Sequence, residues 1–181
     1  DVYVGGQAPI VNKIESVTGG DNFEKLTLGS NTVTTTVTDE PSGQGDLTTV
    51  GISGDASVTE GGTASYTLTL SNPSKSEVTV TLTYSGTASN GQDYTGVATV
   101  KIPANSSGAT FTIKTLDDQL VEGSEHFVVK ISGVSGGNFE NLQVDASKSS
   151  VTTTILDNDN APVSPGGAVT VSEQDAYGLI A

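Results

Sequence analysis

The chain has 181 residues, of which 21 are acidic and 7 are basic, and its formal net charge is −14. This excess of acids argues against partners such as nucleic acid or an anionic membrane surface, because both attract a cationic surface. No stretch approaches the roughly 20 apolar residues of a membrane span, so direct membrane insertion is not expected. The absence of Cys excludes disulfides and thiolate metal sites.

The remaining composition indicates an all-β protein. Gly occurs 22 times, and Thr, Ser and Val fill most of the remainder. Thr and Val favour pleated, half-buried surfaces, whereas Gly and Asn favour turns. Because aromatic residues make up only 5% of the chain, we expect a core of Val, Ile and Leu with a few Phe and Tyr.

The first forty residues repeat a later part of the chain. Asp1, Ile14 and Gly19 each match an identical residue 117 positions further on, and residues 31–41 parallel residues 149–159. A match of this length predicts a fragment of a tandem array that opens in mid-pattern without a signal peptide. Its predicted parts are the C-terminal half of a preceding unit (1–46), a complete unit (47–160), and a linker with the start of a following domain (161–181).

The half-unit at residues 1–46 leaves several arrangements open. Strands without their partners expose an edge and an apolar face. The segment could pack on the complete unit, pair with a second copy, or be completed by residues outside this chain. An inserted domain could also separate it from the rest of its own unit, which would make it one part of a split domain.

Within the complete unit, short segments alternate apolar and polar residues with a period of two. Turn signals such as Gly61-Gly62 and Asn90-Gly91 separate them. Seven such strands in about 110 residues predict an all-β fold, a seven-stranded antiparallel Greek-key-like β-sandwich. The first strand is expected to end near Glu60, and the others are expected near residues 66–70, 78–84, 100–102, 111–113, 127–131 and 151–155.

Carboxylates fall where the first, third, fifth and seventh strands end. If each connection reverses the chain, these strand ends meet at one pole of the sandwich. Eight candidate metal ligands are therefore expected together: Glu60, Asp93, Asp117, Asp118, Glu122, Glu125, Asp157 and Asp159. The opposite pole carries a mixed and ordinary set of charges: Lys75, Glu77, Glu140, Asp145 and Lys148.

So many carboxylates repel one another unless a cation compensates them, and those loops contain no Lys or Arg. Ca²⁺ accepts six to eight oxygen ligands in irregular loops, whereas Mg²⁺ prefers strict octahedral geometry. Zinc or copper would favour His or Cys, and the single His is His126. The pattern therefore favours two or more calcium ions; the alternative is a solvated acidic rim.

At these residues the sequence resembles the Calx-beta domain. The resemblance lies in SVTEGGTASYTLTLSN, GTASNGQDYT, LDDQLVEGSEHFVVKIS and ILDND, which together span most of residues 47–160. It implies calcium-ligand roles for the same eight carboxylates. The last motif has Asn158 inside its acidic run, which leaves the role of Asn158 open. The half-unit has Gly5 and Ala8 where Glu122 and Glu125 stand, so its own calcium site is expected to be degenerate or lost.

The Cys-free, acidic tandem also resembles the extender regions of large bacterial RTX-type surface adhesins. That resemblance implies a calcium-binding structural module on the extracellular bacterial cell surface, with a part in adhesion and biofilm formation. Its partners would be neighbouring domains of the same chain, with host or surface ligands bound through other domains.

Two other functions remain open, and a third is disfavoured. A ligand-binding module for sugar or protein commonly uses exposed aromatics, yet Trp is absent, and Tyr84 and Tyr94 are expected to pack inside. A calcium-sensor domain of a membrane protein would share the metal site but not the purpose. A hydrolase needs a substrate groove, for which a sandwich of about 110 residues leaves little room. We therefore expect no enzymatic activity.

Overall fold

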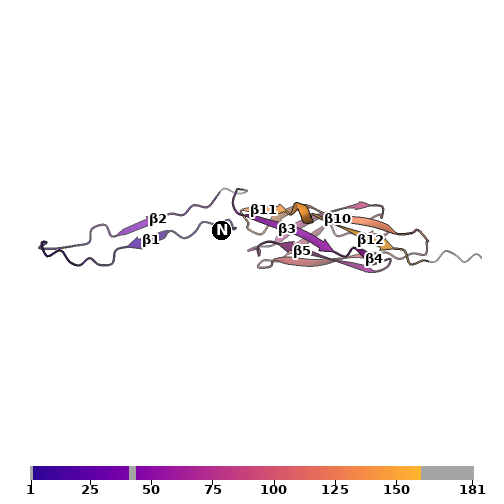
Figure 1. Ribbon diagram of the computed structural model, residues 1–181, viewed down its shortest axis with the longest axis horizontal. Coiled ribbons are helices and arrows are strands. Elements are labelled where there is room, and N and C mark those ends of the chain that lie inside the picture. The colour runs from indigo at the N-terminus through magenta and orange to yellow at the C-terminus, as the bar shows by residue number, and fades with distance from the viewer. Residues whose placement is uncertain (1, 41–43, 160–181) are drawn as a thin grey trace, which may run out of the picture.

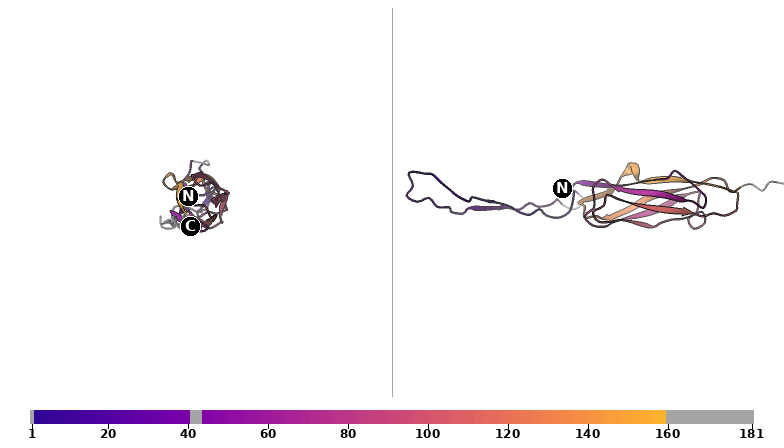
Figure 2. Two further views of the ribbon diagram at one scale, coloured as in Figure 1. Left: turned by 90° about the vertical axis from the view of Figure 1, so that its right-hand side faces the viewer. Right: turned by 90° about the horizontal axis from the view of Figure 1, so that it is seen from below.

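The computed structural model describes residues 2–40 and 44–159 and shows an all-β protein. Two five-stranded sheets pack face to face, and a two-stranded hairpin extends from one end along the same long axis (Figure 1). The view from below shows the same elongated arrangement, and in the end-on view the hairpin and the sandwich overlap in a compact outline (Figure 2). In the described part of the chain, no helix has the length and apolar character needed to cross a membrane. The predicted linker and following domain at 161–181 lie outside the described residues.

The two sheets have the strand order of a Greek-key sandwich. Neighbouring strands are antiparallel except for the pairs β4–β12 and β11–β3, which are parallel. The first sheet consists, in spatial order, of β4 (Ser57–Thr59), β12 (Ser150–Leu156), β10 (Glu125–Gly136), β6 (Val78–Gly86) and β8 (Thr99–Ile102). The second consists of β11 (Asn141–Val144), β3 (Leu47–Gly54), β5 (Thr63–Leu70), β9 (Gly108–Thr115) and β7 (Tyr94–Thr95), and a short 3₁₀ helix, η1 (Ala146–Lys148), precedes β12.

The fold class predicted from the sequence is confirmed, with refinements at the sheet edges. The first predicted strand is divided into β3 and β4, which belong to different sheets. Hydrogen bonds hold the crossing point: Thr153 Oγ1 donates to the carbonyl of Asp55, and the N–H of Thr154 donates to the carbonyl of Ala56. The short strands β7 and β11 are additional, because segments of two and four residues carry too little alternation to be recognised.

The core follows from the alternation of apolar residues along the strands. In β5 every second side chain is buried, including Tyr66, Leu68 and Leu70. The ring of Tyr94 stacks on Phe127 with centroids 4.3 Å apart, which closes the core beneath the loops at one end. Each such large side chain stabilises the fold by about 1.5–3 kcal/mol through burial. As expected, the core consists mainly of Val, Ile and Leu with Phe and Tyr.

The hairpin of β1 (Ile10–Lys13) and β2 (Thr32–Thr35) reproduces the pairing of β10 with β12. Ile10 pairs with Thr35 just as Phe127 pairs with Thr153, positions that lie 117 and 118 residues further on. The other three pairs of the hairpin keep the same correspondence. The sequence repeat is therefore also a repeat of backbone register.

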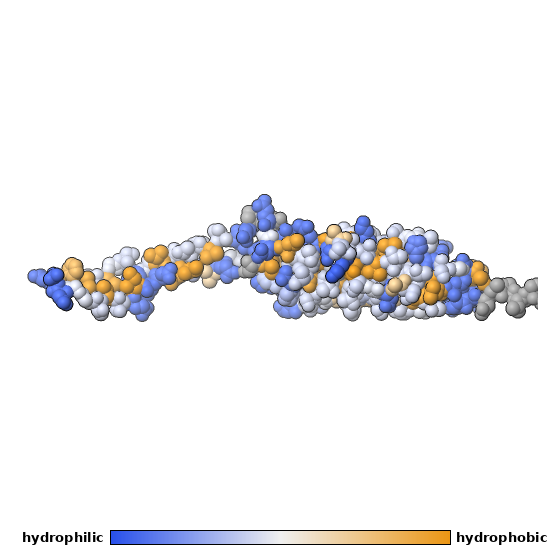
Figure 3. Space-filling model, viewed as in Figure 1, coloured by the Kyte–Doolittle hydropathy of each residue, from blue (hydrophilic) through white to orange (hydrophobic). Residues whose placement is uncertain are grey.

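The hairpin carries apolar side chains that lie open to solvent. Ile10, Val11, Phe23 and Val33 are each more than half exposed. Apolar residues accordingly mark the surface along much of the hairpin (Figure 3). Within the described residues β1 and β2 pair only with each other, so their apolar side chains lack the second sheet that covers the equivalent strands of the sandwich.

The segment that leads into the hairpin docks on the end of the sandwich. Tyr3 stacks on Phe139 with centroids 5.6 Å apart, and its hydroxyl donates to the carbonyl of Pro73 at 2.6 Å. The ammonium of Lys75 lies 3.9 Å from the centre of the Tyr3 ring. The N–H of Val4 donates to the carbonyl of Asn138. Hydrogen bonds and ring contacts therefore fix the start of the hairpin against the sandwich.

Candidate metal centre

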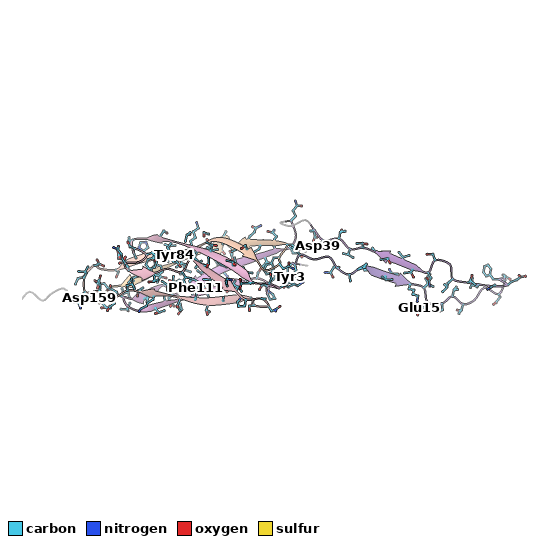
Figure 4. The ribbon with its side chains drawn as sticks, turned by 180° about the vertical axis from the view of Figure 1, so that it is seen from behind. Tyr3, Glu15, Asp39, Tyr84, Phe111 and Asp159 are labelled. Carbon is cyan, nitrogen blue, oxygen red and sulfur yellow. The ribbon has the colours of Figure 1, made fainter. Side chains whose placement is uncertain are left out.

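The end of the sandwich opposite the hairpin is acidic. The β4–β5, β6–β7 and β9–β10 connections meet there with the segment that leaves β12, and Asp159 lies at this end (Figure 4). The structure places all eight predicted carboxylates at this end, which we call the acidic tip: Glu60, Asp93, Asp117, Asp118, Glu122, Glu125, Asp157 and Asp159. The antiparallel reversal of the chain brings them together from four separate segments.

Three of these carboxylates form a first cluster, made of Glu60, Asp157 and Asp159. Each offers one oxygen, and these oxygens lie within 4.8 Å of one another. All three residues are half-buried. The N–H of Glu60 donates to the carbonyl of Leu156 at 3.0 Å, which joins the end of β4 to the end of β12. Pairing of these two parallel strands thus positions the cluster.

A second cluster joins Asp93, Glu122 and Glu125, again with one oxygen of each within 4.8 Å of the others. Asp93 is held in its loop because its Oδ2 accepts a hydrogen bond from the N–H of Ser89 at 2.6 Å. The carbonyl of Asp93 accepts from the N–H of Leu116 at 2.9 Å, which ties this loop to the end of β9. Both sheets therefore position the second cluster, because Glu125 begins β10 of the first sheet and the loop of Asp93 is bonded to the end of β9 in the second.

Asp157 connects the two clusters. Its Oδ2 accepts hydrogen bonds from the N–H groups of Glu122 and Gly123, both at 2.9 Å, and its Oδ1 accepts from the N–H of Asp159 at 2.8 Å. One pocket is lined by Asp157 together with Glu60 from the first cluster and the three acids of the second. The two clusters are therefore parts of one centre.

Asp117 and Asp118 lie beside the clusters and outside both of them. Oδ1 of Asp118 accepts from the N–H of Leu120 at 2.7 Å. Oδ1 of Asp117 accepts from the amide of Asn158 at 3.2 Å, and the same amide donates to the carbonyl of Glu60. Asn158 thus links the segment after β12 to two neighbouring loops, a positioning role that the sequence left open.

The charges of the acidic tip act on one another. Burial raises the pKa of Glu60, and the nearby charges of Asp118, Asp159 and Asp157 raise it further. Burial and the charge of Asp157 likewise raise the pKa of Asp159. The pKa of Asp157 is instead lowered, because the N–H groups of Gly123, Asp159 and Glu122 stabilise its charged form. The tip therefore holds negative charge that its own residues compensate only in part.

The tip meets the chemical requirements of a hard divalent cation. Oδ2 of Asp159 is buried and has no hydrogen-bond partner among the described residues. Two ion pairs of the described residues, Lys13 with Glu15 and Lys101 with Glu77, lie away from the tip. An unpartnered buried carboxylate oxygen costs free energy that a cation would offset. Six carboxylates in two adjoining clusters supply the oxygen ligands that Ca²⁺ prefers.

We expect Glu125→Gln to raise the melting temperature of the metal-free protein at pH 7. Burial raises the pKa of Glu125, and the charges of Asp93 and Glu122 raise it further. A carboxyl with a raised folded pKa contributes stability that is present below its unfolded pKa and lost as the pH rises through the folded pKa. At pH 7 ionised Glu125 is therefore destabilising, and the neutral amide should raise the melting temperature by about 1–3 °C.

Differential scanning calorimetry in chelator measures this effect. Glu15→Gln, at an exposed acid of the hairpin, provides the control and should leave the melting temperature unchanged. The gain from Glu125→Gln should disappear well below the ordinary Glu pKa of 4.5, where both side chains are neutral. A lower melting temperature for Glu125→Gln at pH 7 would contradict mutual repulsion at the tip.

A third group of acids, which the sequence did not reveal, lies at the opposite end of the sandwich. It consists of Asp39, Glu40 and Glu140. The sequence predicts an ordinary surface charge at Glu140, and this prediction is wrong because the structure buries Glu140. One signal was present in the repeat: Asn-Phe-Glu occurs at both Glu24 and Glu140. Burial of an acid in a turn cannot be recognised from that motif alone.

Comparison with known proteins agrees with this fold. A family model described as LapA domain matches residues 46–158, whereas no curated protein matches the chain. The apo-form Calx CBD1 domain is 23% identical at a TM-score of 0.53, with 63% of this chain and 100% of that one covered. CBD12 from CALX1.2 is 22% identical at a TM-score of 0.52, with coverage of 64% and 47%. These two likenesses confirm the predicted Calx-beta-like fold.

A further solved structure is described as the calcium binding domain CBD12 of CALX1.1. It is 26% identical at a TM-score of 0.50, and the similarity covers 60% of this chain and 43% of that one. The described sandwich thus corresponds to less than half of the longer CBD12 chains.

Proposed function

The chain belongs to the LapA domain family, and from the two connected carboxylate clusters of its tip we propose that it is a calcium-binding structural module. The observation that carries the proposal is the position of Asp157, which fixes Glu122 and Gly123 of one loop and adjoins both clusters. In this proposal each cluster holds one calcium ion, with water completing the coordination. The 26% identity to a chain described as a calcium binding domain supports the choice of ion.

Calcium is preferred to magnesium because of the way the ligands are held. The six carboxylates of the clusters come from four separate segments, all but Glu125 lie outside the strands, and Glu122 is exposed. Ca²⁺ tolerates such sites and takes bidentate carboxylates, whereas Mg²⁺ demands near-ideal octahedral geometry and retains its water. We therefore propose calcium as the ion that compensates the charge of the tip.

The role proposed for this calcium is to stiffen the junction that follows β12. Asp157 and Asp159 come directly after the last strand, and the chain continues beyond them. Calcium bound there would hold the exit segment against the β4–β5 and β9–β10 loops. Without calcium, repulsion among the same carboxylates would loosen that contact.

We place this module in the extender region of an extracellular bacterial adhesin, without enzymatic activity. The register shared by β1–β2 and β10–β12 supports a tandem array in which residues 1–46 are half of a preceding unit. Residues 47–160 would be the complete unit. The high acidity and absence of Cys also match the adhesin extenders that the sequence resembles. Neighbouring domains of the same chain are then the principal partners.

A direct sugar-binding role is less well supported. A sugar-binding surface commonly presents exposed aromatic rings. Near the tip, Tyr94 is buried, and the hydroxyl of half-buried Tyr84 donates to the carbonyl of Val97. Neither ring is therefore presented as a stacking surface.

Isothermal titration calorimetry of the whole chain with calcium tests the proposal. We expect two ions to bind at the tip and Glu122→Ala to remove or weaken the ion of the second cluster. The expected loss in affinity is about 10- to 100-fold, while circular dichroism should show an unchanged sheet because Glu122 is exposed. Magnesium at the same concentration should bind more weakly. Equal calcium binding by the chain and by a variant neutral at all six cluster positions would refute the proposal.

A further inference from the structure

The end of the sandwich that faces the hairpin holds a separate group of acids, Asp39, Glu40 and Glu140, which we call the junction cluster. One carboxylate oxygen of each lies within 4.8 Å of the others. Asp39 follows β2, whereas Glu140 lies between β10 and β11 of the sandwich. Figure 4 shows Asp39 beside Tyr3 where the hairpin meets the sandwich, at the opposite end from Asp159. The junction cluster is therefore distinct from the acidic tip.

Glu140 is the unusual member of this cluster because it is almost fully buried, with only 2% of its surface exposed. Its Oε2 accepts a hydrogen bond from the N–H of Asp46 at 3.0 Å, but Oε1 is buried without a hydrogen-bond partner in the described chain. Gly45 provides the space, since a Cβ there would clash with the Glu140 carboxylate. A buried carboxylate with an unpartnered oxygen requires either a proton or a cation.

Asp39 is held in place by the same contact that holds Asp157 at the tip. The N–H of Gly5 donates to Oδ2 of Asp39 at 2.7 Å, as the N–H of Glu122 donates to Oδ2 of Asp157 at 2.9 Å. In the repeat, Gly5 corresponds to Glu122 and Asp39 to Asp157. The contact with Gly5 also lowers the pKa of Asp39, so its ionised form is favoured.

We propose that Asp39, Glu40 and Glu140 bind a divalent cation that fastens the hairpin to the sandwich. The ligands are carboxylate oxygens only, which suits Ca²⁺. The ion would give the buried Oε1 of Glu140 a partner, and the exposed Asp39 and Glu40 would leave room for water ligands. Because one acid belongs to the sandwich and two belong to the segment after β2, the ion restrains the junction between them.

The repeat extends this reasoning to neighbouring units. Glu24 of the hairpin corresponds to Glu140, and Asp39 corresponds to Asp157. Each repeat therefore carries a Glu in the Asn-Phe-Glu motif and an Asp in the segment that follows its last strand. A cation joining these two acids across a junction is a device that a tandem array could use repeatedly.

Equilibrium dialysis with radioactive calcium tests the proposal by counting ions bound to the whole chain. The double variant Asp39→Asn with Glu40→Gln should bind one ion fewer than the parent, and so should Glu140→Gln. Glu15→Gln, at an exposed acid that pairs with Lys13, should bind the full number. If Glu140→Gln fails to fold, the double variant still decides, because both of its positions are exposed.

Amide NMR signals of Gly5 and Asp46 provide a local reading, since these groups donate to Asp39 and Glu140. Both should shift on calcium addition, and the shifts should persist in a variant whose tip clusters are neutral. If the parent chain bound no calcium at the tip but still showed these shifts, the proposed function would be wrong and the junction site would remain supported. An undiminished ion count in the double variant would overturn the junction site. Amide signals that respond to pH but not to calcium would also overturn it, because they would show that these acids share a proton instead of a cation.

Discussion

Calcium should raise the melting temperature of the chain by on the order of 10 °C above its value in chelator. An ion that binds only the folded state stabilises it by about 2.7 kcal/mol when its free concentration is 100 times Kd. In the unfolded chain the carboxylates of the tip are far apart, so they bind calcium much more weakly than in the folded chain. In the folded chain, burial and mutual charge raise the pKa of Glu60, Glu125 and Asp159, so metal binding also relieves repulsion.

Thermal melting followed by circular dichroism, in calcium and in chelator, measures this shift. Magnesium at equal concentration should produce a smaller rise, because the clusters lack a rigid octahedral frame. Glu77→Gln is a suitable control, because Glu77 pairs with Lys101 and belongs to none of the three acid clusters. A melting temperature that is the same in millimolar calcium and in chelator would exclude a calcium-dependent structural role.

The sandwich could be predicted from the sequence because its strands carry the period of two that a half-buried strand requires. The alternation of Tyr66, Leu68 and Leu70 with Thr became the alternation of buried and exposed side chains in β5. The crossing of the first strand between sheets could not be predicted. It depends on Thr153, about 98 residues away, which hydrogen bonds to the carbonyl of Asp55, and such a long-range contact leaves no local pattern.

The convergence of acids at the tip was predictable for a topological reason. In an antiparallel meander alternate strand ends share a pole. The positions of Glu60, Asp93 and Asp157 at strand ends were therefore sufficient to predict that their carboxylates lie at the same end of the sandwich. The sequence could not divide the acids into two clusters. That division depends on backbone N–H groups, such as those of Glu122 and Gly123, whose directions are set by the folded loops.

The junction cluster was not predicted because it depends on burial and on the docking of two distant segments. Glu140 has an ordinary sequence environment, and only the folded turn excludes water from it. The same repeat comparison that found Gly5 and Ala8 in place of two tip acids suggested a lost site. It did not show that the retained Asp39 lies beside an acid of the sandwich.

Asp157→Ala should weaken calcium binding at both clusters of the tip, by about 10- to 100-fold. Asp157 is a member of the first cluster, and through the N–H groups of Glu122 and Gly123 it also positions the loop of the second. Removing its carboxylate therefore removes one ligand directly and releases the loop that holds others. Calcium titration calorimetry should show both tip affinities reduced together.

Asp157→Asn separates the two contributions. The amide oxygen can still accept from the N–H groups of the loop but carries no charge, so the second cluster should keep more of its affinity than in Asp157→Ala. Asp145→Ala is the matched control, since Asp145 also accepts a backbone hydrogen bond, from Ser147, but caps the short helix η1 away from the tip. If Asp157→Ala weakened only one ion and left the other at full affinity, the two clusters would be independent sites, and Asp157 would not be the element that couples them.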